Sequence, residues 1–205
     1  MAHATDGDQE HSDISDDTTL AAAAAALDEG HIDKAIAIYR PLVAHGGGDE
    51  WSALVGLAVS HARRKEWSEA EDCLLRVLKH VPDAGQVCAY LASVRLELGR
   101  IDEAQADMAA ALEMAPGSAI VRLKHAEMLL RLGALQEAYT ELQRAAKLNP
   151  SDATTLEYIR GLLVTTKKAL SQSIDHRGAS PAEFWRALKA RIQGNRPAAA
   201  ARRSS

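Results

Sequence analysis

Apolar and small residues recur along the chain at a fixed interval, most clearly between residues 85 and 152. Seven positions of one stretch have counterparts 34 residues later: Ala92, Gly99, Ile101, Ala104, Met108, Ala111 and Pro116 correspond to Ala126, Gly133, Leu135, Ala138, Leu142, Ala145 and Pro150. A repeat of this length, with apolar residues at helical spacing around a central glycine, is typical of stacked helical hairpins. The pattern therefore predicts an all-α chain.

The same pattern predicts four hairpins, at about 16–48, 49–82, 83–116 and 117–150. In the second of them Lys65 stands where the turn glycine is expected, so that turn departs from the pattern. Small residues are expected where the two helices of a hairpin approach closely, and larger ones fill the space between neighbours. Because no hairpin can bury its apolar face alone, the hairpins must stack in order.

Residues 153–170 repeat the pattern of a first helix, but no second helix follows them. They predict the polar capping helix that a stack of repeats needs at its end. Residues 1–15 form an acidic segment with few apolar residues, and residues 194–205 form a basic one. Both are expected to be disordered, since neither can bury enough apolar surface to offset the loss of chain entropy.

A polar linker at residues 171–180 leads to a further helix predicted at 181–193. Ser180 and Pro181 are strong helix-start residues. The helix is basic, and its apolar stripe consists of Phe184, Trp185, Leu188 and Ile192. Four large apolar side chains are not expected to stay in water together. The stripe should therefore meet its own chain, a second copy, a membrane surface or a partner, and docking within its own chain is the preferred interpretation.

At the repeated positions the chain resembles the tetratricopeptide repeat family, over about residues 16–152 and the capping helix. The resemblance implies an α-solenoid of about four tetratricopeptide hairpins with a C-terminal cap helix. It also implies that the first helices of the hairpins line a concave groove that binds a helical or extended segment of another protein. On this basis the groove residues are Val55, Val59, Arg63, Tyr90, Ser93, Glu97, Leu123, Lys124, Glu127, Arg131 and Tyr158.

One subgroup of the family holds the C-terminal carboxylate of heat-shock chaperones with Lys and Asn residues of the groove. Here the equivalent positions are occupied by Leu20, Ala24, Val55 and Val59. The carboxylate clamp is therefore absent, and the apolar floor with mixed charges at one end suits an amphipathic helix better than an acidic tail.

Four polar residues fall where the family usually packs apolar ones: His61, Arg95, Arg122 and His125. They are either part of a partner site or side chains whose long stems lie along neighbouring helices with the polar heads in water. The second interpretation is preferred, because long basic side chains often cover apolar surface in this way.

Charge and cysteine content limit the other possibilities. The net charge is −4, but the beginning of the chain is acidic and its end is basic. Cys73 and Cys88 lie at apolar helix positions without metal-ligand spacing, which indicates buried free thiols in a reducing compartment. The acidic start does not match a signal peptide, and no apolar run reaches membrane-spanning length, so a cytoplasmic location is expected.

Catalysis is not expected, because the eight histidines are scattered and no nucleotide-binding glycine loop or metal-ligand motif is present. No cofactor or metal is expected, and nucleic acid is not an expected partner because the basic and aromatic residues occur together only in residues 181–193. A basic amphipathic helix can also lie on an anionic membrane surface. The sequence thus indicates a non-enzymatic interaction scaffold or adaptor. The alternative is a tethering or assembly factor that uses residues 181–193 on a membrane or a larger complex, and a homo-oligomer is a further option.

Overall fold

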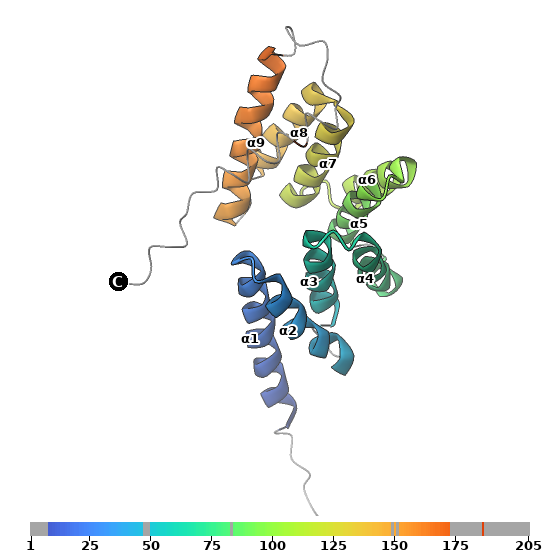
Figure 1. The fold of residues 1–205 in the computed structure, drawn as a ribbon, viewed down its shortest axis with the longest axis vertical. Coiled ribbons are helices and arrows are strands. Elements are labelled where there is room, and N and C mark those ends of the chain that lie inside the picture. The colour runs from blue at the N-terminus through green and yellow to red at the C-terminus, as the bar shows by residue number, and fades with distance from the viewer. Residues whose placement is uncertain are drawn as a thin grey trace, which may run out of the picture. The chain divides into compact units, whose positions relative to one another are not determined.

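The computed structural model describes residues 8–46, 50–82, 84–148, 150, 152–172 and 186. All regular secondary structure in these residues is helical (Figure 1), which confirms the predicted all-α class. The helices are α1 (Asp8–Asp28), α2 (Ile32–His45), α3 (Glu50–Arg63), α4 (Trp67–His80), α5 (Gly85–Glu97), α6 (Ile101–Met114), α7 (Ala119–Leu132), α8 (Leu135–Lys147) and α9 (Ala153–Gln172).

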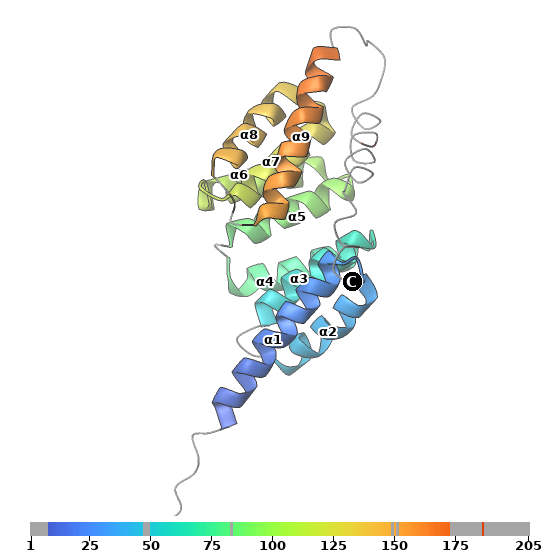
Figure 2. The same ribbon diagram turned by 90° about the vertical axis from the view of Figure 1, so that its left-hand side faces the viewer.

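The helices divide between two compact units, Met1–Pro82 and Asp83–Ser205. In the first unit α1 pairs with α2 and α3 pairs with α4, while both α1 and α2 also pack against α3. In the second unit α5 pairs with α6 and α7 pairs with α8, and α9 packs along α8 (Figure 2). The first helices α5 and α7 also contact each other directly.

Each hairpin buries a small residue of its second helix in its core. The residues are Ala35, Ala70, Ala104 and Ala138, and all four are 0% exposed. A methyl side chain lets the helix backbones approach, and the larger residues then pack between neighbouring helices. In the first unit α2 and α3 meet in the same way, because the ring of buried Tyr39 occupies the space where Gly56 lacks a side chain.

The turns inside the four hairpins share one backbone conformation. Gly30, Gly99 and Gly133 have φ of 86°, 80° and 82°, in the left-handed region that glycine adopts without steric cost. Lys65 replaces glycine in the second hairpin but has a φ of 63°. The closing hydrogen bond is also retained, since the amide of Glu66 donates to the carbonyl of His61 at 2.9 Å. Having Lys65 in place of glycine therefore changes the side chain at this position but leaves the backbone conformation of the turn unchanged.

Two helices are longer than the sequence pattern indicated. Helix α1 begins at Asp8 instead of residue 16, so half of the segment expected to be disordered is helical. Each residue added to an existing helix gains a hydrogen bond that offsets the entropy of ordering it, without a new nucleation step, and the alanine-rich part of α1 is a strong nucleus. Helix α9 continues to Gln172, and the carboxylate of Asp152 caps its start by accepting hydrogen bonds from the amides of Thr154 and Thr155 at 3.1 and 2.9 Å.

Candidate functional site

Three first helices of the second unit bring predicted groove residues together. Lys124, Glu127 and Arg131 are spaced three and four residues apart on α7, so they lie on one side of that helix. They meet residues of α5 on one flank and a residue of α9 on the other. We use the name first-helix face for the set Tyr90, Ser93, Glu97, Lys124, Glu127, Arg131 and Tyr158.

Polar contacts connect this face across the three helices. The Arg131 guanidinium lies 2.7 Å from the carboxylate of Glu97, which joins α7 to α5. The phenol of Tyr158 donates to the carboxylate of Glu127 at 2.9 Å, which joins α9 to α7. Lys124 donates to the same carboxylate at 2.9 Å, and its ammonium group lies 5.5 Å from the centre of the Tyr90 ring. The contacts hold the three helices at a defined spacing.

The charged side chains of the first-helix face are partly open to solvent. Glu127 and Lys124 are 16% and 23% exposed, and Arg131 and Glu97 are 25% and 27% exposed. The face thus carries two ion pairs, with the Tyr90 ring beside Lys124 and the Tyr158 phenol beside Glu127. Such a surface offers hydrogen bonds, ion pairs and aromatic contacts to a ligand, and its groups show no arrangement of nucleophile, acid and base for catalysis.

The predicted groove residues of the first unit have other surroundings. Val55 and Val59 are half-buried on α3, and Val59 packs against the core of its unit. The guanidinium of Arg63 donates to the carbonyl of Leu27 and lies 3.8 Å from Asp28. Arg63 therefore satisfies a carbonyl at the end of α1, a common use of a basic side chain at a helix C-terminus.

Leu123 is 6% exposed and belongs to the core that α7 shares with α8 and α9. Its neighbour Lys124 is on the open side of α7, because successive residues of a helix point about 100° apart. Little of the Leu123 side chain is accessible to a partner. The expected apolar floor of the groove is therefore reduced at this position.

Three of the four polar residues found at usually apolar positions hydrogen-bond to partners within their own hairpins, and the fourth, His125, lies 3.7 Å from the carboxylate of Glu141 without a hydrogen bond at Nδ1 among the described residues. The imidazole of His61 lies 2.6 Å from the carboxylate of Glu66, and Arg95 donates twice to the carboxylate of Asp107, at 2.9 and 3.1 Å. The side chain of Arg95 is only 18% exposed. The preferred interpretation, with the polar heads in water, is wrong for these residues, because a half-buried charge needs a partner in place of the water that it loses.

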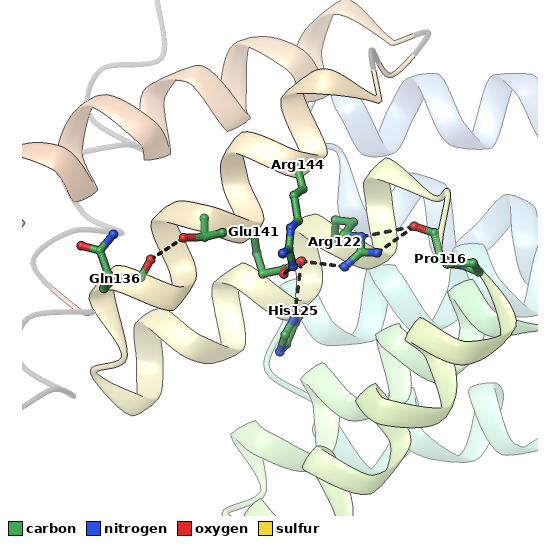
Figure 3. Close-up of polar contacts among 7 residues, drawn as sticks. Pro116, Arg122, His125, Gln136, Glu141 and Arg144 are labelled. Carbon is green, nitrogen blue, oxygen red and sulfur yellow. Dashed lines mark hydrogen bonds and ion pairs between the residues drawn. The ribbon is translucent and has the colours of Figure 1, made fainter.

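The largest of these polar clusters surrounds Glu141 of α8 (Figure 3). Glu141 is 5% exposed, and its carboxylate accepts hydrogen bonds from Arg122 of α7 at 3.0 Å and from Arg144 of its own helix. Arg122 also donates to the carbonyl of Pro116 at 3.1 and 3.2 Å. His125 completes the cluster, with its Nδ1 atom 3.7 Å from the carboxylate. Glu141 was not identified from the sequence, although a charged residue beside Leu142 on the apolar stripe of α8 is the signal that could have found it.

The pKa values within this cluster follow from burial and hydrogen bonding. Burial alone raises the pKa of Glu141, but the hydrogen bonds from Arg122 and Arg144 outweigh it and bring the pKa below its ordinary value. Burial lowers the pKa of His125 despite the nearby carboxylate. The cluster therefore holds an ionised Glu141 and two arginines at neutral pH, which indicates a structural link between α7 and α8.

Several predictions concern residues that the structure does not describe. The apolar stripe at Phe184, Trp185, Leu188 and Ile192 lies outside the described residues, and so do most of the basic residues around it. Within the described ranges, no group of His, Cys, Asp or Glu has the arrangement of a metal site. The described helices also include none that is long and apolar enough to cross a membrane.

The fold and the first-helix face together define a protein of repeated helical hairpins with a polar surface on its first helices. The family model for the tetratricopeptide repeat matches residues 20–85 and 91–153, more than half of the chain. The chain therefore belongs to the tetratricopeptide repeat family, as the repeated positions predicted. Members of this family generally mediate protein–protein interactions and are typically not enzymes.

Solved structures with the same fold have low sequence identity to this chain. A fragment of MamA from Desulfovibrio magneticus RS-1 is 15% identical with a TM-score of 0.51, over 78% of this chain and 93% of that one. A tetratricopeptide repeat protein from Parabacteroides merdae ATCC 43184 is 16% identical with a TM-score of 0.51, over 88% of this chain and 77% of that one. No curated protein matches the sequence. At this identity the similarity shows the fold alone.

Proposed function

We propose that the protein is an interaction adaptor whose first-helix face binds a helical or extended segment of a partner protein. The observation that carries this proposal is the connected face itself. Side chains from α5, α7 and α9 are held together by cross-helix contacts and remain about one-sixth to one-quarter exposed. A surface that is already organised loses little entropy when a ligand binds.

The charge pattern of the face limits the kind of partner. Lys124 and Arg131 are already paired with Glu127 and Glu97, so the face has no excess of either sign. A uniformly acidic or basic tail would meet as much repulsion as attraction. An amphipathic segment with charges of both signs, and with an apolar side chain to cover the tyrosine rings, fits the face better.

A charge swap can separate binding from stability at this site. In the double variant Glu97→Arg with Arg131→Glu, the ion pair between α5 and α7 is rebuilt with opposite polarity. We expect this variant to melt close to the wild type, whereas each single variant brings two like charges together and melts lower. Although the double variant should keep its stability, it should not bind the partner, because the partner meets a reversed charge pattern.

Binding is measured by affinity capture from an extract of the native cell, with the retained partner quantified by mass spectrometry. A partner should be retained by the wild type, lost with the double swap and lost with Lys124→Glu. The matched control is Lys34→Glu, the same change at an exposed lysine of the second helix α2, which should retain the partner. If a bound protein stays with the double swap and with Lys124→Glu as firmly as with the wild type, the first-helix face is not the binding site.

A further inference from the structure

Helix α9 carries an open stripe on the side away from its core contacts. Glu157, Gly161, Val164 and Lys168 follow one another at spacings of four, three and four residues, so they lie on one face of the helix. The core residues Ile159 and Leu162 are 0% exposed, whereas Val164 is 70% exposed, the largest value for a large apolar side chain in the described part of the chain. The stripe is therefore an unpartnered face of α9.

The chemistry of this stripe changes along its length. Glu157 and Lys168 are both exposed, so the stripe has a carboxylate near the start of α9 and an ammonium group near its end. Between them, a side chain added at Gly161 would meet no atom within 4 Å. The middle of the stripe therefore has an exposed valine beside open space, where a large apolar side chain from another helix has room to pack.

The chain that follows α9 is long enough to return to this stripe. Eight residues, 173–180, separate Gln172 from the predicted helix at 181–193, and they can span at most about 27 Å. Gly161 lies eleven residues before Gln172, which corresponds to about 16 Å along α9. A helix at residues 181–193 that runs antiparallel to α9 can therefore cover the whole stripe.

The charges of that segment match an antiparallel return. Its only acidic residue, Glu183, is near its start, and Lys189 and Arg191 are in its second half. Running back along α9, the segment brings Lys189 and Arg191, which flank its apolar stripe, towards Glu157. Arg186, which the structure does describe, is helical and exposed, as expected for the outer side of such a helix.

We propose that residues 181–193 dock on the stripe Glu157, Gly161, Val164 and Lys168 of the same chain as an antiparallel helix, with Trp185 and Leu188 packed over Val164 and Gly161. The short linker favours this occupant over a second copy, since a tether of this length gives an effective concentration in the millimolar range. The stripe shares no residue with the first-helix face, so the proposal does not depend on the proposed partner.

Fluorescence of Trp185 in the full chain tests the proposal. The other tryptophans, Trp51 and Trp67, are in the first unit, so the difference between the wild type and Trp185→Phe isolates the signal of interest. We expect this signal to be shifted to the blue and protected from acrylamide, at a level that does not change on dilution. Val164→Glu should remove the protection, and it should leave the circular dichroism unchanged because Val164 is exposed.

Two further comparisons make the test specific. The matched control Leu75→Glu changes an apolar residue of α4 that is 41% exposed, and it should keep the protection of Trp185. Glu157→Lys should weaken the protection, and addition of Lys189→Glu should restore it, because the pair is rebuilt with reversed charges. Restoration would support the antiparallel alignment directly.

Three results would overturn the proposal. The first is that acrylamide quenches the fluorescence of Trp185 in the wild type as strongly as in the free peptide 181–193. The second is a protection that disappears on dilution, which would assign the segment to a second copy. The third is a protection that appears only when vesicles of anionic lipid are added, which would assign it to a membrane surface.

Discussion

Replacing Glu141 with alanine is expected to lower the free energy of unfolding by about 2–3 kcal/mol. The Glu141 side chain is 7% exposed, and its carboxylate lies 3.0 Å from the guanidinium of Arg122, whose side chain is 21% exposed. Breaking a fully buried ion pair costs about 3–5 kcal/mol, because the remaining charge has no compensation. Arg122 keeps some contact with water and its hydrogen bonds to the Pro116 carbonyl, so the cost should fall below that range. Arg144 is 58% exposed and adds little.

A second variant identifies the cause of the loss. If the loss comes from the unpaired Arg122 charge, replacing both partners, as Arg122→Met with Glu141→Leu, should restore most of the stability. Apolar replacements of a buried pair are often neutral or stabilising. His125 should not disturb the result near pH 7, since burial lowers its pKa and keeps the ring neutral.

Thermal melts followed by circular dichroism provide the measurement. For a chain of this size, the expected loss corresponds to a melting temperature lower by about 5–10 °C. Hydrogen exchange read by mass spectrometry should place the increased exchange in α7 and α8.

The pKa of Glu141 is lowered from its ordinary value of 4.5. The advantage of Glu141 over alanine is therefore complete above that value and is lost as the pH falls through the folded-state pKa. An alanine variant within about 0.5 kcal/mol of the wild type, or a double variant less stable than the single one, would refute this account of the cluster.

Three other substitutions test particular features of the fold in the same melts. Lys65→Gly should raise the unfolding free energy by about 1 kcal/mol, because it removes the side chain from a residue in the left-handed conformation; a lower melting temperature would contradict this. Thr166→Val should also stabilise by about 1 kcal/mol, since the Thr166 hydroxyl is 0% exposed and has no hydrogen-bond partner in the described part of the chain; Thr165→Val, at a hydroxyl bonded to the Gly161 carbonyl, is the control that should not stabilise. Gly56→Ala should destabilise by about 1–3 kcal/mol, because the added carbon would lie 2.3–2.7 Å from atoms of the Tyr39 ring; an unchanged melt would show that the ring moves aside freely.

Local spacing along the chain was sufficient to predict the hairpins. Positions such as Ala104 and Ala138 specify a close helix crossing, and Gly99 and Gly133 specify a turn. These requirements involve residues near one another in sequence, so they can be read without knowing the tertiary structure. The family resemblance went further and placed Lys124 and Arg131 on a first-helix surface.

The sequence by itself therefore determined the class of the protein and the length of its repeat. Only the tertiary structure decided which side chains meet across helices. Glu97 contacts Arg131 and Glu127 contacts Tyr158, although each pair is more than 30 residues apart. Whether a side chain is open or buried depends on the rotation of its helix against its neighbours, and hydrophobic periodicity leaves this rotation uncertain by about one residue. For that reason Leu123 is in the core while Lys124 is on the open face, a distinction made by packing between α7 and its neighbours.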